Sequence, residues 1–587
     1  MPTSKHRLLF VFLAGALLCA GSGDAQTQRR ADQSATSNSL QRSSSAPVTT
    51  VDQAIDRVIA REHEEVATIW RFNPVMETYI QDMKPNSDTG ALPLRDHYFV
   101  GHANLEKSVV EERFSDGDKE REGRLLGKSA SHGEDHFVKL AYADPNGFDR
   151  EHYEFEYVRR ELLGDVRCLV FDVTPLRGGG DERFRGRIWA EDQNFTIVRF
   201  NGVHTSKEEP GGRELHFDSW RFNLQPNIWL PTYIYAQESD AKDRDVRFKA
   251  QIRFWGYGAK NNQGEEDLQD ASDDSSAASD RQENQTSDKT AQAAERKAQL
   301  AAANRTIAEL QVAGLLAPRG ELDHVMEIVV NNLEVTNNLD IQPEIRCRTL
   351  LTSTLESFSV GHTIVLSRGL LDALPDEASL AAILAQEMAA ILAGPPAKAD
   401  RKSHEGTGLE RLSESGHFML KYSDNEIQAA NQKALELLRN SPYKAKLDSP
   451  GLFLEQVAGE HKVLSALISP RVGDRANLGG ELAGAGAARR TGNSDRPVAV
   501  RMGTRVKLDP WSNQITLLKA KPTAPVSARE YDPFELLPLF PFLTRDQGEG
   551  SSATTRSGKS AGKKPSTGQP GAEGSTPGDA PPPTPPQ

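Results

Sequence analysis

Glu387 is an acidic residue on an otherwise apolar helix face. Residues 374–396 predict a helix, because Pro375 and Asp376 favour a helix start and Gly394 with the two prolines after it favours a stop. Apolar side chains recur at helical spacing between these limits, and Glu387 falls on the same stripe. A carboxylate on a buried face costs free energy unless it is paired, so Glu387 requires a partner or a chemical role.

The residues around Glu387 have the spacing of a zinc motif but lack its imidazoles. In the HExxH motif, two histidines at i and i+4 bind zinc from one helix face, and the glutamate beside the first activates the bound water. Here Gln386 and Ala390 occupy the two histidine positions, and Glu387 occupies the position of the general base. A lone carboxylate does not hold zinc against water, because zinc sites use three or four protein donors.

The surrounding chain resembles the zinc metallopeptidase family of HtpX, the CaaX prenyl endopeptidase and BepA, peptidase family M forty-eight. The residues that carry the resemblance lie within 319–480: SFS at 357–359, TIVLSRGLL at 363–371 and YSDNEIQAA at 422–430. The resemblance implies an α+β zincin-like domain of the gluzincin type, with Glu387 at the general-base position and Glu426 at the third zinc-ligand position. It also implies a strand that offers its edge to a polypeptide substrate, made of Ile364, Val365, Leu366 and Ser367.

The polar positions of the site are where the chain departs from that family. Gln386, Ala390, Ala430 and Ser469 stand where the family has His, His, Asp and His, and the downstream element that contains Ser469 is also matched by Arg475. Four polar positions lost together indicate a site that no longer holds metal. The first hypothesis is therefore a pseudo-peptidase without a cofactor, which binds a polypeptide or an envelope protein partner and does not cut it.

An active metalloendopeptidase with substitute zinc ligands is the second hypothesis. Three histidines are candidates for these ligands: His362 lies close to the strand edge, and His404 and His417 lie between the two predicted helices. Against this hypothesis, loop histidines are more often solvated than metal-bound.

Within residues 47–258, the sequence predicts a helix from Val51 to Trp70 and, from Tyr98 to Gly258, short alternating strands separated by turn residues such as Gly164 and Asp165. The pattern predicts an antiparallel sheet with one apolar face, curved into a half-barrel. The strands around Trp189, Trp220 and Trp229 resemble the LolA-type lipoprotein-carrier fold, whose half-barrel holds acyl chains. This resemblance implies a third hypothesis, lipid or lipoprotein binding, whereas the alternative is that these tryptophans are ordinary core residues.

The composition of the 587-residue chain bounds its class. A net charge of −13 without a basic block argues against a nucleic-acid partner. A basic start followed by an apolar run over residues 8–20 predicts a signal peptide, hence export to the periplasm or the extracellular space. Beyond it no uninterrupted apolar run is long enough for a transmembrane span, so we expect none in the mature chain.

The expected organisation is multidomain. Cys168 and Cys347 fall in different predicted domains, so an interdomain disulfide and two buried free thiols both remain open. The predicted order is a signal peptide (1–25), a flexible lead-in (26–46), the β domain (47–258), an acidic linker and helical strut (259–318), the metallopeptidase-like domain (319–480), a linker with a small β and apolar module (481–547) and a disordered tail rich in Pro, Gly and Ser (548–587).

Overall fold

The computed structural model describes residues 50–86, 90–114, 134–176, 183–205, 213–240, 245–258, 287–394, 423–473, 478–482, 505–518, 534–536, 538 and 541–546. The predicted signal peptide, lead-in and tail lie outside these residues, as do most of the acidic linker and His404, His417 and Arg475.

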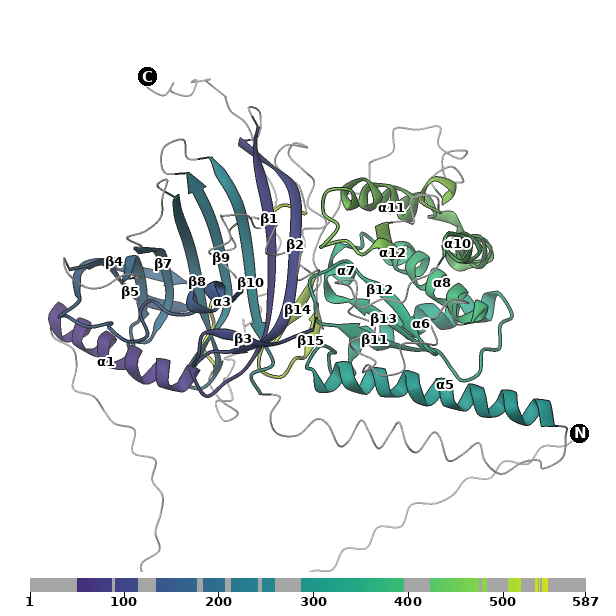
Figure 1. The fold of residues 1–587 in the computed structure, drawn as a ribbon, viewed down its shortest axis with the longest axis horizontal. Coiled ribbons are helices and arrows are strands. Elements are labelled where there is room, and N and C mark those ends of the chain that lie inside the picture. The colour runs from purple at the N-terminus through teal and green to yellow at the C-terminus, as the bar shows by residue number, and fades with distance from the viewer. Residues whose placement is uncertain are drawn as a thin grey trace, which may run out of the picture. The chain divides into compact units, whose positions relative to one another are not determined.

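The first part of the described chain is a ten-stranded antiparallel sheet (Figure 1). The strand order is β3-β2-β1-β10-β9-β8-β7-β6-β5-β4, and every neighbouring pair is antiparallel. The antiparallel sheet predicted from the alternating pattern is confirmed. Its strands are β1 (Val75–Asn86), β2 (Gly90–Asn104), β3 (Val109–Arg113), β4 (Tyr153–Leu163), β5 (Val166–Pro175), β6 (Arg183–Glu191), β7 (Ile197–Thr205), β8 (Arg213–Gln225), β9 (Ile228–Asp240) and β10 (Val246–Trp255).

Helix α1 (Val51–Ile69) packs on one face of this sheet. Thr50 caps its start by accepting a hydrogen bond from the backbone N–H of Gln53. Its buried apolar side chains include Val58, Val66 and Ile69, which lie at helical spacing. A short helix, α3 (Glu134–Lys139), contacts β3.

The second part of the described chain is an α+β arrangement around a three-stranded sheet. This order of helices and strands agrees with the α+β class expected for residues 319–480, but nothing in it identifies a zincin. Its elements are α5 (Ser287–Val312), α6 (Glu321–Thr336), β11 (Arg346–Leu350), β12 (Ser357–Val360), β13 (Thr363–Ser367), α7 (Arg368–Ala373), α8 (Glu377–Ala393), α10 (Asp424–Arg439), η2 (Pro442–Ala445), α11 (Asp448–His461) and α12 (Pro470–Gly473), followed by the hairpin β14 (Val506–Leu508) and β15 (Ile515–Leu517).

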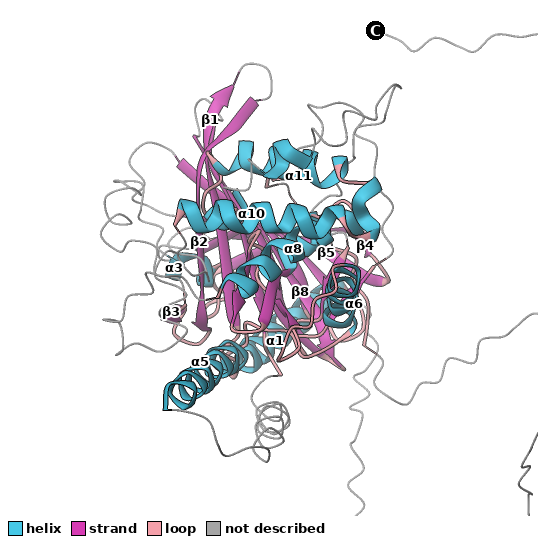
Figure 2. Ribbon diagram, turned by 90° about the vertical axis from the view of Figure 1, so that its right-hand side faces the viewer, coloured by secondary structure: helices cyan, strands magenta, loops and turns pink. Residues whose placement is uncertain are grey.

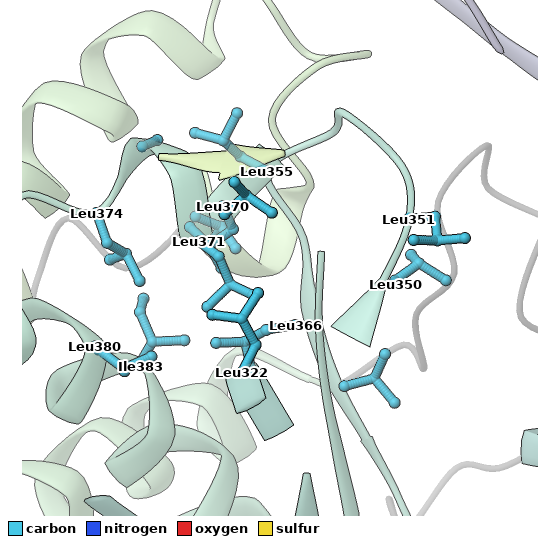
Figure 3. Close-up of a cluster of buried hydrophobic side chains, with 14 of the residues drawn as sticks. Leu322, Leu350, Leu351, Leu355, Leu366, Leu370, Leu371, Leu374, Leu380 and Ile383 are labelled. Atoms are coloured by element: carbon cyan, nitrogen blue, oxygen red, sulfur yellow. The ribbon is translucent and has the colours of Figure 1, made fainter. Parts of the chain in front are cut away.

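Helix α8 is buried along most of its length, and it begins and ends as its sequence predicts. The Asp376 side chain accepts a hydrogen bond from the backbone N–H of Ser379 at the start, and Gly394 ends the helix with a φ of 83°. Helices α6, α10 and α11 contact α8 (Figure 2). The apolar core around it contains Leu322, Leu350, Leu351, Leu355, Leu366, Leu370, Leu371, Leu374, Leu380 and Ile383 (Figure 3).

Two buried carboxylates of the large sheet accept hydrogen bonds from the α+β part. Glu77 in β1 accepts from the backbone N–H and the hydroxyl of Ser353, at 2.5 and 2.6 Å. Asp96 in β2 accepts from the backbone N–H groups of Ala466 and Leu467, at 2.8 and 2.7 Å. Because a buried carboxylate without partners is costly, these bonds hold the two parts in contact.

Candidate functional site

The carboxylate of Glu387 is fully buried and is fixed by an arginine that the sequence reasoning did not identify. Arg471 in α12 donates from Nε to one Glu387 oxygen at 2.9 Å and from Nη2 to the other at 2.5 Å. The hydroxyl of Ser357 in β12 donates to Glu387 at 2.8 Å. A general base must reach a proton on a substrate or a water, and here both oxygens already accept from a guanidinium. The partner that the buried Glu387 carboxylate requires is therefore Arg471, with which it forms an ion pair.

Gln386 and Ala390, which the resemblance aligned with zinc-binding histidines, also have structural roles. Gln386 donates from its amide nitrogen to the side-chain oxygen of Asn431 in α10 at 2.5 Å, which joins α8 to α10. The Gln386 amide oxygen is buried without a hydrogen-bond partner in the described structure, and Ala390 is buried. An amide and a methyl group at these positions supply neither of the imidazole nitrogens that zinc would need.

Glu426, the position of the third ligand, serves as a helix cap. Its carboxylate accepts from the backbone N–H and the hydroxyl of Ser423, at 2.7 and 2.8 Å, which completes a capping box at the start of α10. Ala430 is half-buried further along the same helix, and the hydroxyl of Ser469 is buried without a partner in the described structure. Glu426 and Glu387 therefore have separate structural partners.

His362 is the only one of the three candidate substitute ligands within the described residues. It lies in the turn between β12 and β13, and its Nδ1 is buried without a hydrogen-bond partner in the described structure. Burial lowers the pKa of His362, and a hydrogen bond with the backbone of Pro343 partly opposes this shift. Across the described residues, no group of three or more His, Cys, Asp and Glu side chains is placed to hold a metal ion.

The strand predicted to offer an edge to a substrate is not an edge strand. Ile364, Val365, Leu366 and Ser367 belong to β13, which lies between β11 and β12 in its sheet. β13 pairs in parallel with β11 and antiparallel with β12, so both of its sides already take part in strand pairing. The sequence could not reveal this, because strand order depends on contacts that are distant along the chain.

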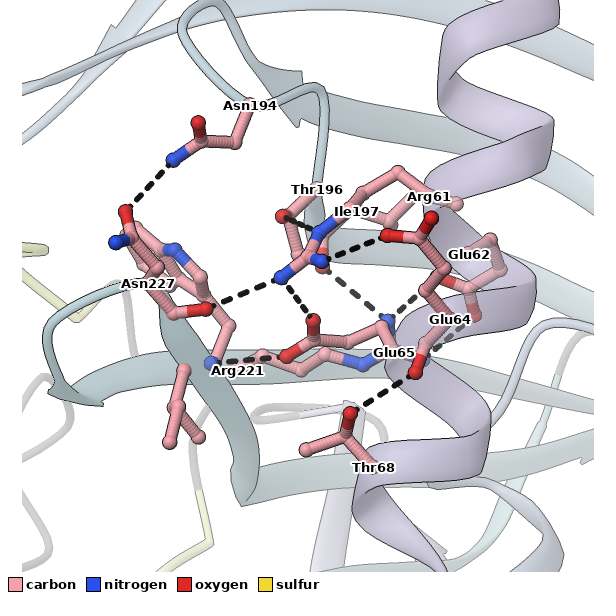
Figure 4. A network of polar contacts seen from close by, with 12 residues as sticks. Arg61, Glu62, Glu64, Glu65, Thr68, Asn194, Thr196, Ile197, Arg221 and Asn227 are labelled. Carbon is pink, nitrogen blue, oxygen red and sulfur yellow. Dashed lines mark hydrogen bonds and ion pairs between the residues drawn. The ribbon is translucent and has the colours of Figure 1, made fainter. Parts of the chain in front are cut away.

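On the large sheet, the face under α1 is closed by a buried ion pair (Figure 4). Arg221 in β8 donates to both oxygens of Glu62 at 2.6 and 2.8 Å, and neither side chain is exposed. Beside it, Glu65 accepts from the backbone N–H of Trp229 at 2.9 Å and from Arg61 at 2.7 Å. Burial raises the pKa of Glu65, and Arg61 acts against this shift. The buried charges fix α1 to the sheet.

The opposite face carries a row of aromatic and charged side chains that we call the tryptophan face: Trp189, Arg199, Trp220, Tyr233 and Tyr235. The strand registers place Trp189 opposite Arg199, Arg199 opposite Trp220, and Trp220 opposite Tyr233. The guanidinium of Arg199 lies 4.3 Å from the ring centre of Trp189 and 4.4 Å from that of Trp220.

Two further hydrogen-bonding features mark this face. Arg199 forms a bidentate ion pair with Asp218, in which Nε and Nη2 donate to the two carboxylate oxygens at 2.8 and 2.9 Å. The indole N–H of Trp220, which is 1% exposed, has no hydrogen-bond partner in the described structure. A buried donor without an acceptor is rare and costly.

A segment near the C-terminus contacts the same sheet. We call its described residues, 534–536, 538 and 541–546, the C-terminal strap. Gln81 in β1 is the register partner of Lys249 in β10, and both side chains lie on the same face of the sheet. The Gln81 side chain forms hydrogen bonds with the strap backbone at Phe534 and Leu536. At the other end, the backbone N–H of Asp165 donates to the carbonyl of Leu543 at 2.9 Å. The strap thus contacts β1 near one end and the turn between β4 and β5 near the other, and these elements lie far apart in the strand order of the sheet.

Other predicted features have a simple outcome in the structure. Cys168 and Cys347 are free and buried, so the reading of two buried thiols holds in place of a disulfide. Trp255 donates from its indole N–H to the carbonyl of Gly314 at 3.0 Å, as a core residue with a satisfied donor. No described helix is both long and apolar enough to cross a membrane.

No family model matches the chain, and no curated protein sequence matches it either. Among solved structures, a DUF1329 family protein from Desulfovibrio piger is 12% identical over 36% of this chain and 95% of its own, with a TM-score of 0.19. A putative outer membrane lipoprotein-sorting protein domain from Vibrio parahaemolyticus is 9% identical over 38% of this chain and 99% of its own, also with a TM-score of 0.19. The Pseudomonas aeruginosa MucA/MucB complex is 10% identical over 34% of this chain and 93% of its own, with a TM-score of 0.15. Likenesses at these identities and TM-scores do not assign a function to this chain.

Proposed function

We propose that this chain is an exported binding protein without catalytic activity, and that it holds an apolar part of a lipid or lipoprotein on the tryptophan face of its large sheet. The observation that carries the proposal is the buried indole N–H of Trp220, which has no acceptor in the described structure although it lies in an aromatic row. An ester or amide carbonyl of an acylated ligand would satisfy this donor, and the aromatic rings would cover the adjoining apolar part.

The contacts of Glu387, Gln386 and Ala390 support binding over hydrolysis. The Glu387 carboxylate already accepts hydrogen bonds from Arg471 and Ser357. No imidazole is present at positions 386 and 390, which are Gln386 and Ala390. In this proposal the α+β part is a docking platform for the sheet. The buried carboxylates of Glu77 and Asp96 hold the two parts together. Export rests on the signal-peptide pattern of residues 1–25.

Mass spectrometry of bound lipid tests the proposal directly. Protein purified without detergent is expected to release acyl chains on organic extraction, and to bind a tripalmitoyl-cysteinyl peptide more tightly than the same peptide without acyl chains. Trp220→Phe keeps an aromatic ring but removes the indole donor, so it should weaken lipopeptide binding by about 2- to 10-fold, the value of one hydrogen bond.

Trp511→Phe is the matched control, because Trp511 contacts Phe72 and lies outside the tryptophan face. Its lipopeptide affinity should equal that of the wild type. A preparation free of acyl chains that also binds no lipopeptide would refute the proposed ligand class.

A further inference from the structure

We propose that the C-terminal strap is a tethered ligand of the tryptophan face, and that the same face accepts in trans a polypeptide of similar chemistry. That polypeptide has apolar residues, an acidic side chain near its N-terminal end and a basic side chain near its C-terminal end. The inference rests on the proposed function, since both use this face, and it names the polypeptide part of the ligand as the part that is recognised.

Gln81 reads the backbone of the strap. Its amide nitrogen donates to the carbonyl of Phe534 at 2.5 Å, and its amide oxygen accepts from the N–H of Leu536 at 3.2 Å. Gln81 is fully buried. A primary amide that pairs with a backbone carbonyl and a backbone N–H recognises a polypeptide whatever its side chains are, and an acyl chain offers neither group.

Among the described residues of the strap, three large apolar side chains are buried and one is exposed. Phe534, Leu536 and Leu543 are 4%, 6% and 1% exposed, whereas Phe542 is 67% exposed. The sheet therefore selects particular positions of the segment, as a peptide-binding surface does.

Two ion pairs of opposite sense fix the direction of the strap. Lys249 in β10 contacts Glu535 at 2.6 Å near one end, and Arg545 contacts Glu191 in β6 at 2.5 Å near the other. The Glu191 side chain is fully buried. A ligand that ran in the opposite direction would place like charges together, so the charge order specifies orientation.

The strap is held by side chains and by a turn, and its described residues form no strand with the sheet. Gly164, with a φ of 64°, permits the close approach, since a Cβ there would lie 2.5 Å from the carbonyl oxygen of Leu543. The strap also leaves the indole N–H of Trp220 without an acceptor in the described structure. A segment bound in this way can leave without breaking a sheet, and a ligand that satisfies Trp220 can replace it.

The test uses the full chain and a fluorescein-labelled peptide with the sequence of residues 532–547. In the release variant Leu536→Asp/Leu543→Asp, the strap loses two buried contacts and the face becomes available. A tethered ligand acts at an effective concentration of about 1 mM. For a peptide with a dissociation constant of about 10–100 μM, fluorescence anisotropy should therefore show about 10- to 100-fold tighter binding to the release variant than to the wild type.

Phe542→Asp is the matched control, because it adds a charge to the same segment at an exposed position. It should bind the peptide as weakly as the wild type does. Equal binding by the release variant and this control would overturn the inference.

A charge exchange keeps the test decisive if the release variant is less stable. Adding Lys249→Glu to that variant should weaken binding of the natural peptide at least about 10-fold, and a peptide with Glu535→Lys should restore it. The wild type, which needs no substitution to fold, should cross-link through Gln81 or its neighbours to a peptide with photoreactive benzoylphenylalanine at position 534. Absence of both the charge exchange and the cross-link would refute the inference.

The outcome is separable from that of the proposed function. Peptide binding without any lipopeptide preference or bound acyl chain would support the tethered ligand and refute the lipid class. Bound acyl chains with no peptide binding by the release variant would do the reverse.

Discussion

Replacement of Arg471 by methionine tests whether the stability of the fold depends on the ion pair of the buried Glu387 carboxylate. The substitution keeps most of the side-chain volume and removes the two charged donors, at 2.5 and 2.9 Å, from a carboxylate that is fully buried. Only the neutral hydrogen bond from Ser357 would remain among the three described above. Removal of one partner of a buried pair costs about 3–5 kcal/mol. Since domains are stable by about 5–15 kcal/mol in total, this loss should be large.

The reverse substitution and the double variant complete the cycle. Glu387→Leu leaves the Arg471 side chain, which is 9% exposed and closer to water, so we expect a smaller cost of about 1–3 kcal/mol. Glu387→Leu with Arg471→Met replaces the pair by apolar groups and should be within about 1 kcal/mol of the wild type. The coupling energy between the two sites should therefore exceed about 2 kcal/mol.

Urea unfolding followed by circular dichroism at 222 nm measures these free energies of unfolding. The control is Arg319→Met, which breaks an ion pair with Glu327 at 2.9 Å in which the arginine side chain is 46% exposed. That loss should be about 0–1 kcal/mol. If Arg471→Met costs no more than this control, or if the two single effects add in the double variant, the reasoning about the buried pair is wrong.

Three further predictions concern other parts of the molecule. Gly164→Ala would place a Cβ 2.5 Å from the Leu543 carbonyl oxygen at a residue with a φ of 64°, so hydrogen exchange in residues 541–546 should accelerate. Gly459→Ala should leave that exchange unchanged, because nothing packs within 4 Å of its added Cβ. Burial raises the pKa of Asp96 above 3.8 and outweighs the opposing effect of its hydrogen bonds, so the folded state binds a proton more readily than the unfolded state does. As the pH falls from 7 to 4, the free energy of unfolding of the wild type should therefore rise relative to that of Asp96→Asn. An unchanged difference between the two proteins would contradict this. Burial also raises the pKa of the Cys168 thiol to about 12, so peptide mapping should find it unlabelled by iodoacetamide at pH 8 in the native protein and labelled in urea.

The sequence alone determined the features that depend on neighbouring residues. Asp376 and Gly394 set the ends of α8 because capping needs only the adjacent backbone, and Gly164 with Asp165 formed the predicted turn for the same reason. The alternating strands gave the antiparallel class of the sheet. The pattern also showed that Glu387 would be buried and would need a partner.

Tertiary structure alone decided which partner that was. Arg471 is 84 residues away from Glu387, and spacing along the chain cannot reveal a contact of that kind. The central place of β13 and the pairing of Gln386 with Asn431 also depend on how distant elements meet. The same holds for the C-terminal strap, whose bond to Gln81 spans 453 residues. Local sequence fixes backbone conformation through short-range sterics and hydrogen bonds, whereas charge neutralisation and strand order are settled when segments far apart in sequence pack together.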